Sequence, residues 1–350
     1  MKKSVQVGNI QIGGGAPVSI QSMCNTRTAD VDASIAQIRR LEEAGCEIIR
    51  LTVPDMESAE AFGQIKRKAH IPVVADIHFD YRLAIAAIDA GADKIRINPG
   101  NIGDEERIRA VVEKARAAHI PIRVGVNSGS LEKDILAKYG RVTAEGLAES
   151  ALRNVQILEK YDFDDIVISL KSSDVQMNYD AYRIVDQACD RPLHIGVTEA
   201  GTPSMGKIKS AAGIGALLLA GIGDTLRVSL TADPVEEVVF AKALLKAIGL
   251  RKSGVEIVSC PTCGRTQVDL ERIAEAVERR AESLAGPMKI AVMGCAVNGP
   301  GEAKEADIGV ACGREEGLLF AGGEIIKKVA EKDIVDELMK LASEFQEGKI

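Results

Sequence analysis

Eight short runs of β-branched and other apolar residues recur through the first ~250 residues of the chain, and amphipathic stretches separate them. The runs span residues 18–22, 47–53, 73–78, 94–98, 122–127, 166–171, 193–198 and 225–230. Helical periodicity is clear over 34–44, 82–90, 105–118 and 144–161. Gly45 and Gly91 stand where two of these helices would end. The length of this region and its eight alternating strand and helix patterns predict a (β/α)8 TIM barrel over residues 1–250, with a doubly wound open sheet as the alternative.

The composition supports strands that are buried on both faces. The chain has no Trp and only 3% aromatic residues, so its core is aliphatic. A formal net charge of −7 leaves no broad basic surface, which excludes nucleic acid as a partner. The first residues carry no apolar leader, and the apolar stretch 211–222 is too short to cross a membrane. We expect a cytoplasmic protein that does not associate with membranes.

Polar side chains come late in successive strands, at the carboxyl end of the expected barrel, which we call the barrel mouth. They are Arg50, Thr52, Asp76, His78, Arg96, Asn98, Arg123, Asn127, Lys171, Glu199, Arg227 and Ser229. Catalytic groups of TIM barrels gather at this end. Four of the residues are Arg and one is Lys, and these five cations would repel one another unless an anion lay between them.

Two interpretations of the five cations are open. Any single Arg could form a structural ion pair with Asp76, Glu199 or a helix carboxylate. All five together favour a bound anion, and four Arg fit a diphosphate better than a monophosphate because a guanidinium binds phosphate through two nitrogens. No GxGxxG follows a strand and no Walker motif occurs, so we predict neither a nicotinamide dinucleotide nor an ATP site. The expected ligand is a phosphate-rich small molecule.

Residues 251–350 begin with a polar linker and predict a second, smaller domain of the α+β class. The expected elements are a strand over 255–259, a helix over 268–284, strands over 289–293 and 307–310, a hairpin around 317–322 and a helix from Asp333. Cys260 and Cys263 follow the first of these strands, and Cys295 follows the second.

The three cysteines favour an iron–sulfur site over a zinc site. Seven Cys in one long chain make a poor disulfide framework. A zinc ribbon would need a second close pair of Cys or His, and no His occurs after His194. Glycines around Cys295 would let backbone amides approach a sulfur cluster closely. A cluster with only three thiolates has an iron that can meet substrate, so the pattern predicts a redox enzyme.

Other functions stay open on spacing alone. One is a zinc-ribbon TIM-barrel lyase or transferase acting on a phosphorylated metabolite, and another is a non-catalytic cluster protein for sensing or cluster delivery. Cys312 is a rival for the fourth ligand of the cluster. Cys24, Cys46 and Cys189 are scattered, and we expect them to be small buried apolar residues.

Several motifs together resemble one enzyme family. The cysteine segments 259–266 and 292–302, the segment 306–309 and the strand ends 96–101, 123–127, 169–173, 196–201 and 223–229 carry the likeness. They are similar to the 4-hydroxy-3-methylbut-2-enyl diphosphate synthase family of the methylerythritol phosphate isoprenoid pathway. The likeness covers essentially the whole chain and matches the two-domain bacterial type.

The resemblance implies a specific set of functional residues. A 4Fe-4S cluster would be held by Cys260, Cys263, Cys295 and Glu302. Glu199 would be the acid that protonates the departing hydroxyl, and we expect burial to raise its pKa toward neutrality. The substrate-binding residues would be Arg50, Asp76, Arg96, Asn98, Arg123, Asn127, Lys171, Arg227 and Ser229. The small domain would be of the sulfite/nitrite reductase-like type.

The resemblance also implies the reaction and the partners. Members of the family are oxidoreductases. They convert 2-C-methyl-D-erythritol 2,4-cyclodiphosphate to 4-hydroxy-3-methylbut-2-enyl diphosphate by two-electron ring opening and dehydroxylation. Flavodoxin or ferredoxin would supply the electrons, docking at a basic spot such as Arg279-Arg280 or Lys327-Lys328, although either pair is more simply a solvated surface. A homodimer is expected, in which the cluster domain of one chain meets the barrel mouth of the other.

Overall fold

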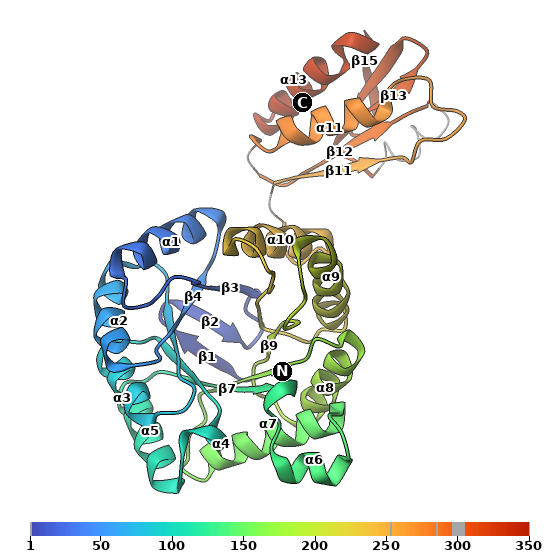
Figure 1. Ribbon diagram of the computed structural model, residues 1–350. Coiled ribbons are helices and arrows are strands. Elements are labelled where there is room, and N and C mark those ends of the chain that lie inside the picture. Colours follow the sequence, from blue (N-terminus) through green and yellow to red (C-terminus); the bar gives the residue numbers. More distant parts are fainter. Residues whose placement is uncertain (1, 253, 285, 296–304, 350) are drawn as a thin grey trace. The chain divides into compact units, whose positions relative to one another are not determined.

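The chain folds into two compact units, Met1–Leu250 and Arg251–Ile350, each with its own sheet and its own apolar core. The computed structural model describes residues 2–252, 254–284, 286–295 and 305–349. Figure 1 shows the path of the chain through both units.

The first unit is a ring of eight parallel strands surrounded by helices (Figure 1). The strands are β3 (Ser19–Met23), β4 (Ile48–Thr52), β5 (Val73–Asp76), β6 (Lys94–Ile97), β7 (Ile122–Asn127), β8 (Ile166–Lys171), β9 (His194–Ile195) and β10 (Thr225–Leu226). They pair in the order β8-β7-β6-β5-β4-β3-β10-β9, always in parallel. A parallel bridge between Ile168 and Leu193 joins β8 to the start of β9. The predicted TIM barrel is confirmed, and the open doubly wound sheet is wrong.

Helices connect the strands and form the outer layer of the barrel. They are α1 (Val31–Ala44), α2 (Met56–Lys68), α3 (Tyr81–Asp89), α4 (Pro99–Ile102), α5 (Glu105–Ala117), α6 (Lys133–Tyr139), α7 (Ala144–Glu159), α8 (Val175–Ala188), α9 (Pro203–Leu219), α10 (Pro234–Ala247) and the 3-10 turn η1 (Ser128–Ser130). Helix α1 begins three residues before the predicted start, because the Asp30 carboxylate accepts a hydrogen bond from the backbone N–H of Ala33. Gly45 and Gly91 end their helices at φ values of +101° and +93°, as predicted.

The barrel strands are buried on two faces that differ in chemistry. In β6, Ile95 and Ile97 belong to the apolar core between the strands and the helices. Lys94 and Arg96 alternate with them and therefore face the barrel interior. The same alternation in the other strands brings polar residues to one enclosed space. The alternation of side chains along each strand therefore places apolar residues in the outer core and polar residues in the barrel interior.

A short hairpin, whose strands we did not predict, closes the amino end of the barrel. It consists of β1 (Ser4–Val7) and β2 (Ile10–Gly13), paired antiparallel. Its apolar residues form one cluster with residues at the start of β4, β5 and β8: Val5, Val7, Ile12, Ile48, Val74 and Val167. Gly8 takes a φ of +56° in the turn, a conformation that glycine adopts without strain. Apolar side chains therefore fill the amino end of the barrel, while polar ones line the mouth.

The second unit is a five-stranded mixed sheet packed against two helices. Its elements are β11 (Val255–Ser259), α11 (Leu270–Ala281), β12 (Met288–Met293), β13 (Ile308–Gly313), β14 (Glu316–Ala321), β15 (Glu324–Ala330), the turn η2 (Glu331–Asp333) and α13 (Ile334–Gln346). The strands lie in sequence order, with β11, β12 and β13 parallel and β14 and β15 antiparallel to their neighbours. Residues of α11 and α13 share one apolar core with β12 and β13.

We predicted a hairpin around 317–322, and the structure has one there, formed by β14 and β15. Residues 317–322 form most of β14, and turns lie on either side of that strand. Strand β15 escaped prediction because its exposed residues include both apolar and charged side chains, which leaves no period of two. Within the described residues, no helix combines the length and apolar character that crossing a membrane would require.

Candidate functional site

The barrel mouth contains a buried carboxylate between two guanidinium groups. Asp76 ends β5 and is 2% exposed. Its Oδ1 accepts a hydrogen bond from Arg96 Nη1 at 3.1 Å, and its Oδ2 lies 3.5 Å from Arg50 Nε. Burial alone would raise the pKa of this carboxyl, but the charges of Arg50, Arg96 and Arg123 outweigh it and lower the pKa to about 2. Asp76 is therefore ionised and holds two cations of the mouth in place.

A second buried carboxylate, Glu237 of α10, binds Arg227. Its Oε2 lies 3.3 Å from both Nε and Nη2 of Arg227, and its Oε1 accepts the backbone N–H of Leu230 at 2.9 Å. We did not predict Glu237, although the sequence carried a signal. The residue shares a helix face with apolar Val238, Ala241 and Leu244, so an acid there would be buried and would need a cation.

Two other cations of the mouth have little to balance them. Arg123 is 1% exposed, and its Nε and Nη1 have no hydrogen-bond partner among the described residues. Lys171 ends β8 and is buried, and burial together with the surrounding guanidiniums lowers its pKa. Structural ion pairs thus account for Arg50, Arg96 and Arg227, but not for Arg123 and Lys171. A buried, unpaired cation is costly, so an anion bound between Arg123 and Lys171 would stabilise the mouth.

The remaining polar residues of the mouth are less buried or form a hydrogen bond within their own segment. Asn98 is buried, and its side chain caps α4 by accepting the N–H of Gly100 at 3.1 Å. Asn127 is half-buried at the end of β7, and Ser229 is half-buried three residues after the end of β10. His78 is exposed, with its Nε2 4.0 Å from Asp76 Oδ2.

Glu199 differs from our expectation. It follows β9 in a loop, takes a φ of +50° and is exposed. The burial that we expected around its carboxyl is absent from this unit, because the loop carries it beyond the strand ends. A non-glycine residue in the left-handed region is uncommon, and such strain occurs often at functional positions.

In the second unit, strand pairing brings two cysteine segments together. Strands β11 and β12 are parallel with Ser259 opposite Val292, so both lead to the same edge of the sheet. There the backbone N–H of Gly294 donates a hydrogen bond to Cys260 Sγ at 3.2 Å, and Cys295 follows directly in the chain. An N–H directed at a thiol sulfur is the kind of contact that stabilises a thiolate ligand.

Cys263 lies exposed in the turn after Cys260. The backbone N–H of Arg265 lowers the pKa of this thiol, helped by the side chains of Arg265 and Thr266. A thiol with a lowered pKa and an open position suits metal ligation, because the thiolate is the ligand. These features fit a cluster held by soft sulfur ligands.

Cys312 has the opposite environment. It is fully buried in the core of the second unit, and burial raises the pKa of its thiol to about 12. Glu302 lies outside the described residues. Among the residues that are described, no three Cys, His, Asp or Glu side chains are close enough together to hold a metal ion by themselves. The structure therefore brings the cysteine segments to one edge without assembling a complete ligand set.

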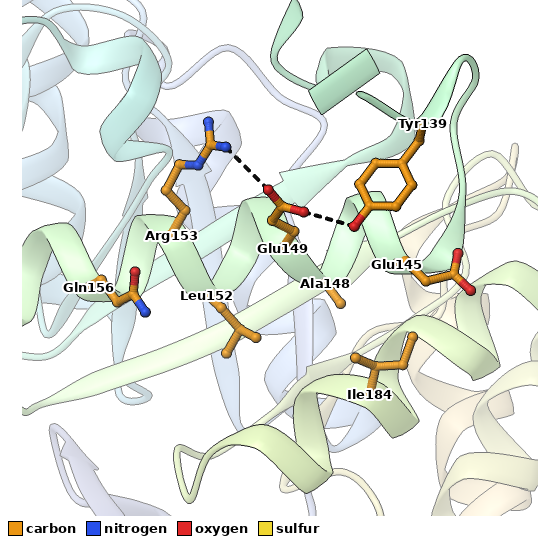
Figure 2. A pocket seen from close by; sticks show the side chains of 8 residues that line it. All are labelled: Tyr139, Glu145, Ala148, Glu149, Leu152, Arg153, Gln156 and Ile184. Carbon is orange, nitrogen blue, oxygen red and sulfur yellow. Dashed lines mark hydrogen bonds and ion pairs between the residues drawn. The ribbon is translucent and has the colours of Figure 1, made fainter. Parts of the chain in front are cut away.

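A hollow outside these sites lies on the outer helices of the barrel. It has a volume of about 440 Å³ and is lined by residues of α6, α7 and α8. Figure 2 shows Glu149 at its centre, bound to Arg153 and to the Tyr139 hydroxyl. Because Glu149 and Arg153 bind each other and Tyr139 binds Glu149, these groups do not indicate a missing ligand.

The fold and the sites together define a class of protein: a TIM barrel with a buried cationic mouth, joined to a unit with cysteines at one sheet edge. The chain belongs to the GcpE family. The GcpE TIM-barrel domain matches residues 2–242, and the GcpE protein C-terminal domain matches residues 256–344.

Similar proteins agree with this membership over almost their full length. A 4-hydroxy-3-methylbut-2-en-1-yl diphosphate synthase (flavodoxin) of Fusobacterium nucleatum is 57% identical over 99% of this chain and 98% of its own. The enzyme of that name from Clostridium perfringens is 59% identical over 97% of each chain.

Solved structures with the same barrel are much more distant. An N-acetylneuraminic acid synthetase from Leptospira borgpetersenii is 15% identical, with a TM-score of 0.50 over 81% of this chain and 98% of that one. A truncated 3-deoxy-D-arabino-heptulosonate 7-phosphate synthase from Thermotoga maritima is 14% identical, with a TM-score of 0.50 over 71% and 94%. At these identities the likeness concerns the fold alone.

Proposed function

We propose that this chain is a flavodoxin-dependent 4-hydroxy-3-methylbut-2-enyl diphosphate synthase. It converts 2-C-methyl-D-erythritol 2,4-cyclodiphosphate to the linear diphosphate by two-electron reductive ring opening and dehydroxylation. The observation that carries the proposal is the cationic mouth, in which Arg123 and Lys171 are buried and form no direct ion pair with any described residue, while the two nearby carboxylates bind other guanidiniums. The names of relatives that match the whole chain support the same function.

In this proposal the first unit binds the substrate. The diphosphate lies between Arg123 and Lys171, and the cations held by Asp76 and Glu237 complete the site. Because these donors are fixed before the ligand arrives, they stabilise the charge that forms on phosphate oxygen as the ring carbon–oxygen bond breaks. Asn98, Asn127 and Ser229 supply neutral hydrogen-bonding groups at the same strand ends.

The second unit carries the redox group. Cys260, Cys263 and Cys295 hold a 4Fe-4S cluster together with Glu302, a hard oxygen ligand that is more easily displaced than a thiolate. When bound, the cluster supplies electrons one at a time. The backbone N–H of Gly294 fixes the position of Cys260. Glu199 donates the proton that leaves with the hydroxyl group.

The two units act together in a homodimer, with the cluster unit of one chain serving the barrel of the other. Flavodoxin is the donor named in the relatives. The basic pairs that we considered for donor docking are already engaged: Arg279 and Arg280 bind Glu275 and Asp336, and Lys327 and Lys328 bind Glu337 and Glu316. These ion pairs support the simpler view of both pairs as solvated surface charges.

Anaerobic purification tests the function directly. We expect a brown protein whose visible absorption bleaches with dithionite and which turns over the cyclodiphosphate with a reduced donor. A colourless protein containing zinc would instead support a zinc-ribbon lyase or transferase. A cluster protein that binds but does not convert the cyclodiphosphate would support a sensor or carrier.

The fourth ligand can be tested by giving the cluster a fourth thiolate. We expect Glu302→Cys to retain the cluster, seen by its visible and electron paramagnetic resonance spectra, while activity falls at least ~100-fold because a thiolate is displaced less readily. Cys312→Val is the matched control, since Cys312 is buried in the apolar core and should not be a ligand. Full activity of Glu302→Cys, or loss of the cluster in Cys312→Val, would contradict the assignment.

A further inference from the structure

Below the barrel mouth lies a set of buried polar residues that no part of the proposed mechanism uses. We call it the buried layer: Ser19, Gln21, Lys94, His194 and Thr225, all at most 2% exposed. Thr225 pairs in register with both Ser19 and His194, so these three side chains lie on the same face of the sheet. Their neighbours in the chain belong to the outer apolar core, so the buried layer faces the barrel interior.

The side chains of the buried layer lack partners among the described residues. Neither ring nitrogen of His194 has a hydrogen-bond partner, and Ser19 Oγ, Thr225 Oγ1 and Gln21 Nε2 have none. Lys94 Nζ has one long contact, 3.4 Å from Gln21 Oε1. Each buried polar group without a partner destabilises the fold, and native proteins rarely retain several together without a reason.

The buried layer is next to the cations of the mouth. Lys94 precedes Arg96 by two residues, and Thr225 precedes Arg227 by two, so these two members point the same way as the cations above them. The charges that act on Lys94 come from Arg50 and Arg123. Those acting on His194 come from Arg50, Lys94, Arg123 and Lys171. The buried carboxylates of the mouth, Asp76 and Glu237, already bind other guanidiniums.

This arrangement determines which groups release protons in the ligand-free protein. Burial, reinforced by the neighbouring cations, lowers the pKa of both Lys94 and His194. A guanidinium keeps its proton even when buried, so the surroundings favour the neutral form only for the imidazole of His194 and for the amines of Lys94 and Lys171. A diphosphate bound at the mouth would add several negative charges near them and favour their charged forms.

We propose that Lys94 and His194 take up protons from solvent when a diphosphate binds at the barrel mouth, and so supply part of its counter-charge. This inference rests on the proposed diphosphate site. In the ligand-free protein the neutral layer relieves repulsion among the cations of the mouth. In the complex the charged layer strengthens the hold on the anion. The layer acts as a positioning and charge-balancing element and does not touch the reacting atoms.

Calorimetry of the cluster-loaded, full-length protein can count these protons. Inorganic pyrophosphate is titrated at one pH into the protein in buffers of different ionisation enthalpy, and the dependence of the binding heat on that enthalpy gives the protons exchanged. We expect the wild type to take up close to one proton more than Lys94→Met, which should also bind pyrophosphate roughly tenfold more weakly. Comparing the variants removes the ionisation of pyrophosphate itself from the result.

Thr225→Val is the matched control, since it changes the same layer without removing a titratable group, and it should keep the proton uptake of the wild type. His194→Gln provides a second test and should lose part of the uptake. The uptake should shrink at lower pH, where both groups are already protonated before the ligand binds. Equal uptake in the wild type and Lys94→Met would overturn the inference while leaving the diphosphate site intact. Failure of the wild type to bind pyrophosphate would overturn both.

Discussion

Mixing two inactive variants of this protein should restore activity. Glu199→Gln removes the proposed proton donor of the barrel, and Cys295→Ser removes a ligand of the proposed cluster; each should be at least ~1,000-fold less active than the wild type. If the barrel of one chain uses the cluster unit of the other, a mixed dimer contains one site in which both parts are intact. Random pairing then gives about a quarter of the wild-type activity per chain.

The mirror experiment has the opposite expectation and serves as its control. A chain with both substitutions is mixed with the wild type in equal amounts. If sites form between chains, every site of the mixed dimer is defective and about a quarter of the activity remains, from wild-type dimers alone. If sites form within one chain, about half remains and the first mixture stays inactive. Exchange of chains is checked with two affinity tags. The two mixtures together therefore decide how barrel and cluster unit combine.

Much of the barrel could be predicted because its strands obey a simple period. Lys94 and Arg96 alternate with Ile95 and Ile97, and this pattern places the polar residues inside whatever the partner strands are. The TIM-barrel rule then assigns the strand ends to the functional face. Local sequence and general topology were sufficient to predict which charged residues meet at the barrel mouth. The structure brings these residues together there: Arg50, Asp76, Arg96, Arg123, Lys171 and Arg227.

The parts that escaped prediction depend on contacts between distant segments. The first hairpin has strands of four residues, and Val5 and Val7 are recognisable as core only once Val74 and Val167 lie above them. Glu237 meets Arg227 through the packing of α10 on the barrel. The exposure of Glu199 follows from the path of its loop, which no periodicity describes.

The carboxylates of the barrel mouth do not balance all of its cations. The mouth has two buried carboxylates, Asp76 and Glu237, and both bind guanidiniums, which fixes the donors without neutralising Arg123 or Lys171. An additional acid beside those two would satisfy the site internally and compete with a diphosphate. This charge balance supports the proposed diphosphate site, and within it the Asp76 carboxylate binds two of the buried guanidiniums.

Replacing that carboxylate should destabilise the barrel strongly. We expect Asp76→Asn to lower the free energy of unfolding by about 3–5 kcal/mol, because the amide leaves Arg50 and Arg96 buried without their counter-ion and directs N–H donors toward them. Urea unfolding followed by circular dichroism measures the loss. Asp80→Asn is the control: Asp80 also binds an Arg and caps α3, but it does so at the surface, so its loss should be about 1 kcal/mol or less.

The same carboxylate predicts a pH dependence. Its pKa in the folded protein, about 2, lies below its ordinary value of 3.8, so the ionised form stabilises the fold at all pH values above about 4. As the pH falls from 4 toward 2, about 2 kcal/mol of stability should be lost through this group. The wild type should therefore lose more stability over this range than Asp76→Asn, whose amide does not titrate. Parallel pH profiles for the two proteins, or equal losses in Asp76→Asn and Asp80→Asn, would show that Asp76 does not hold the cations of the mouth.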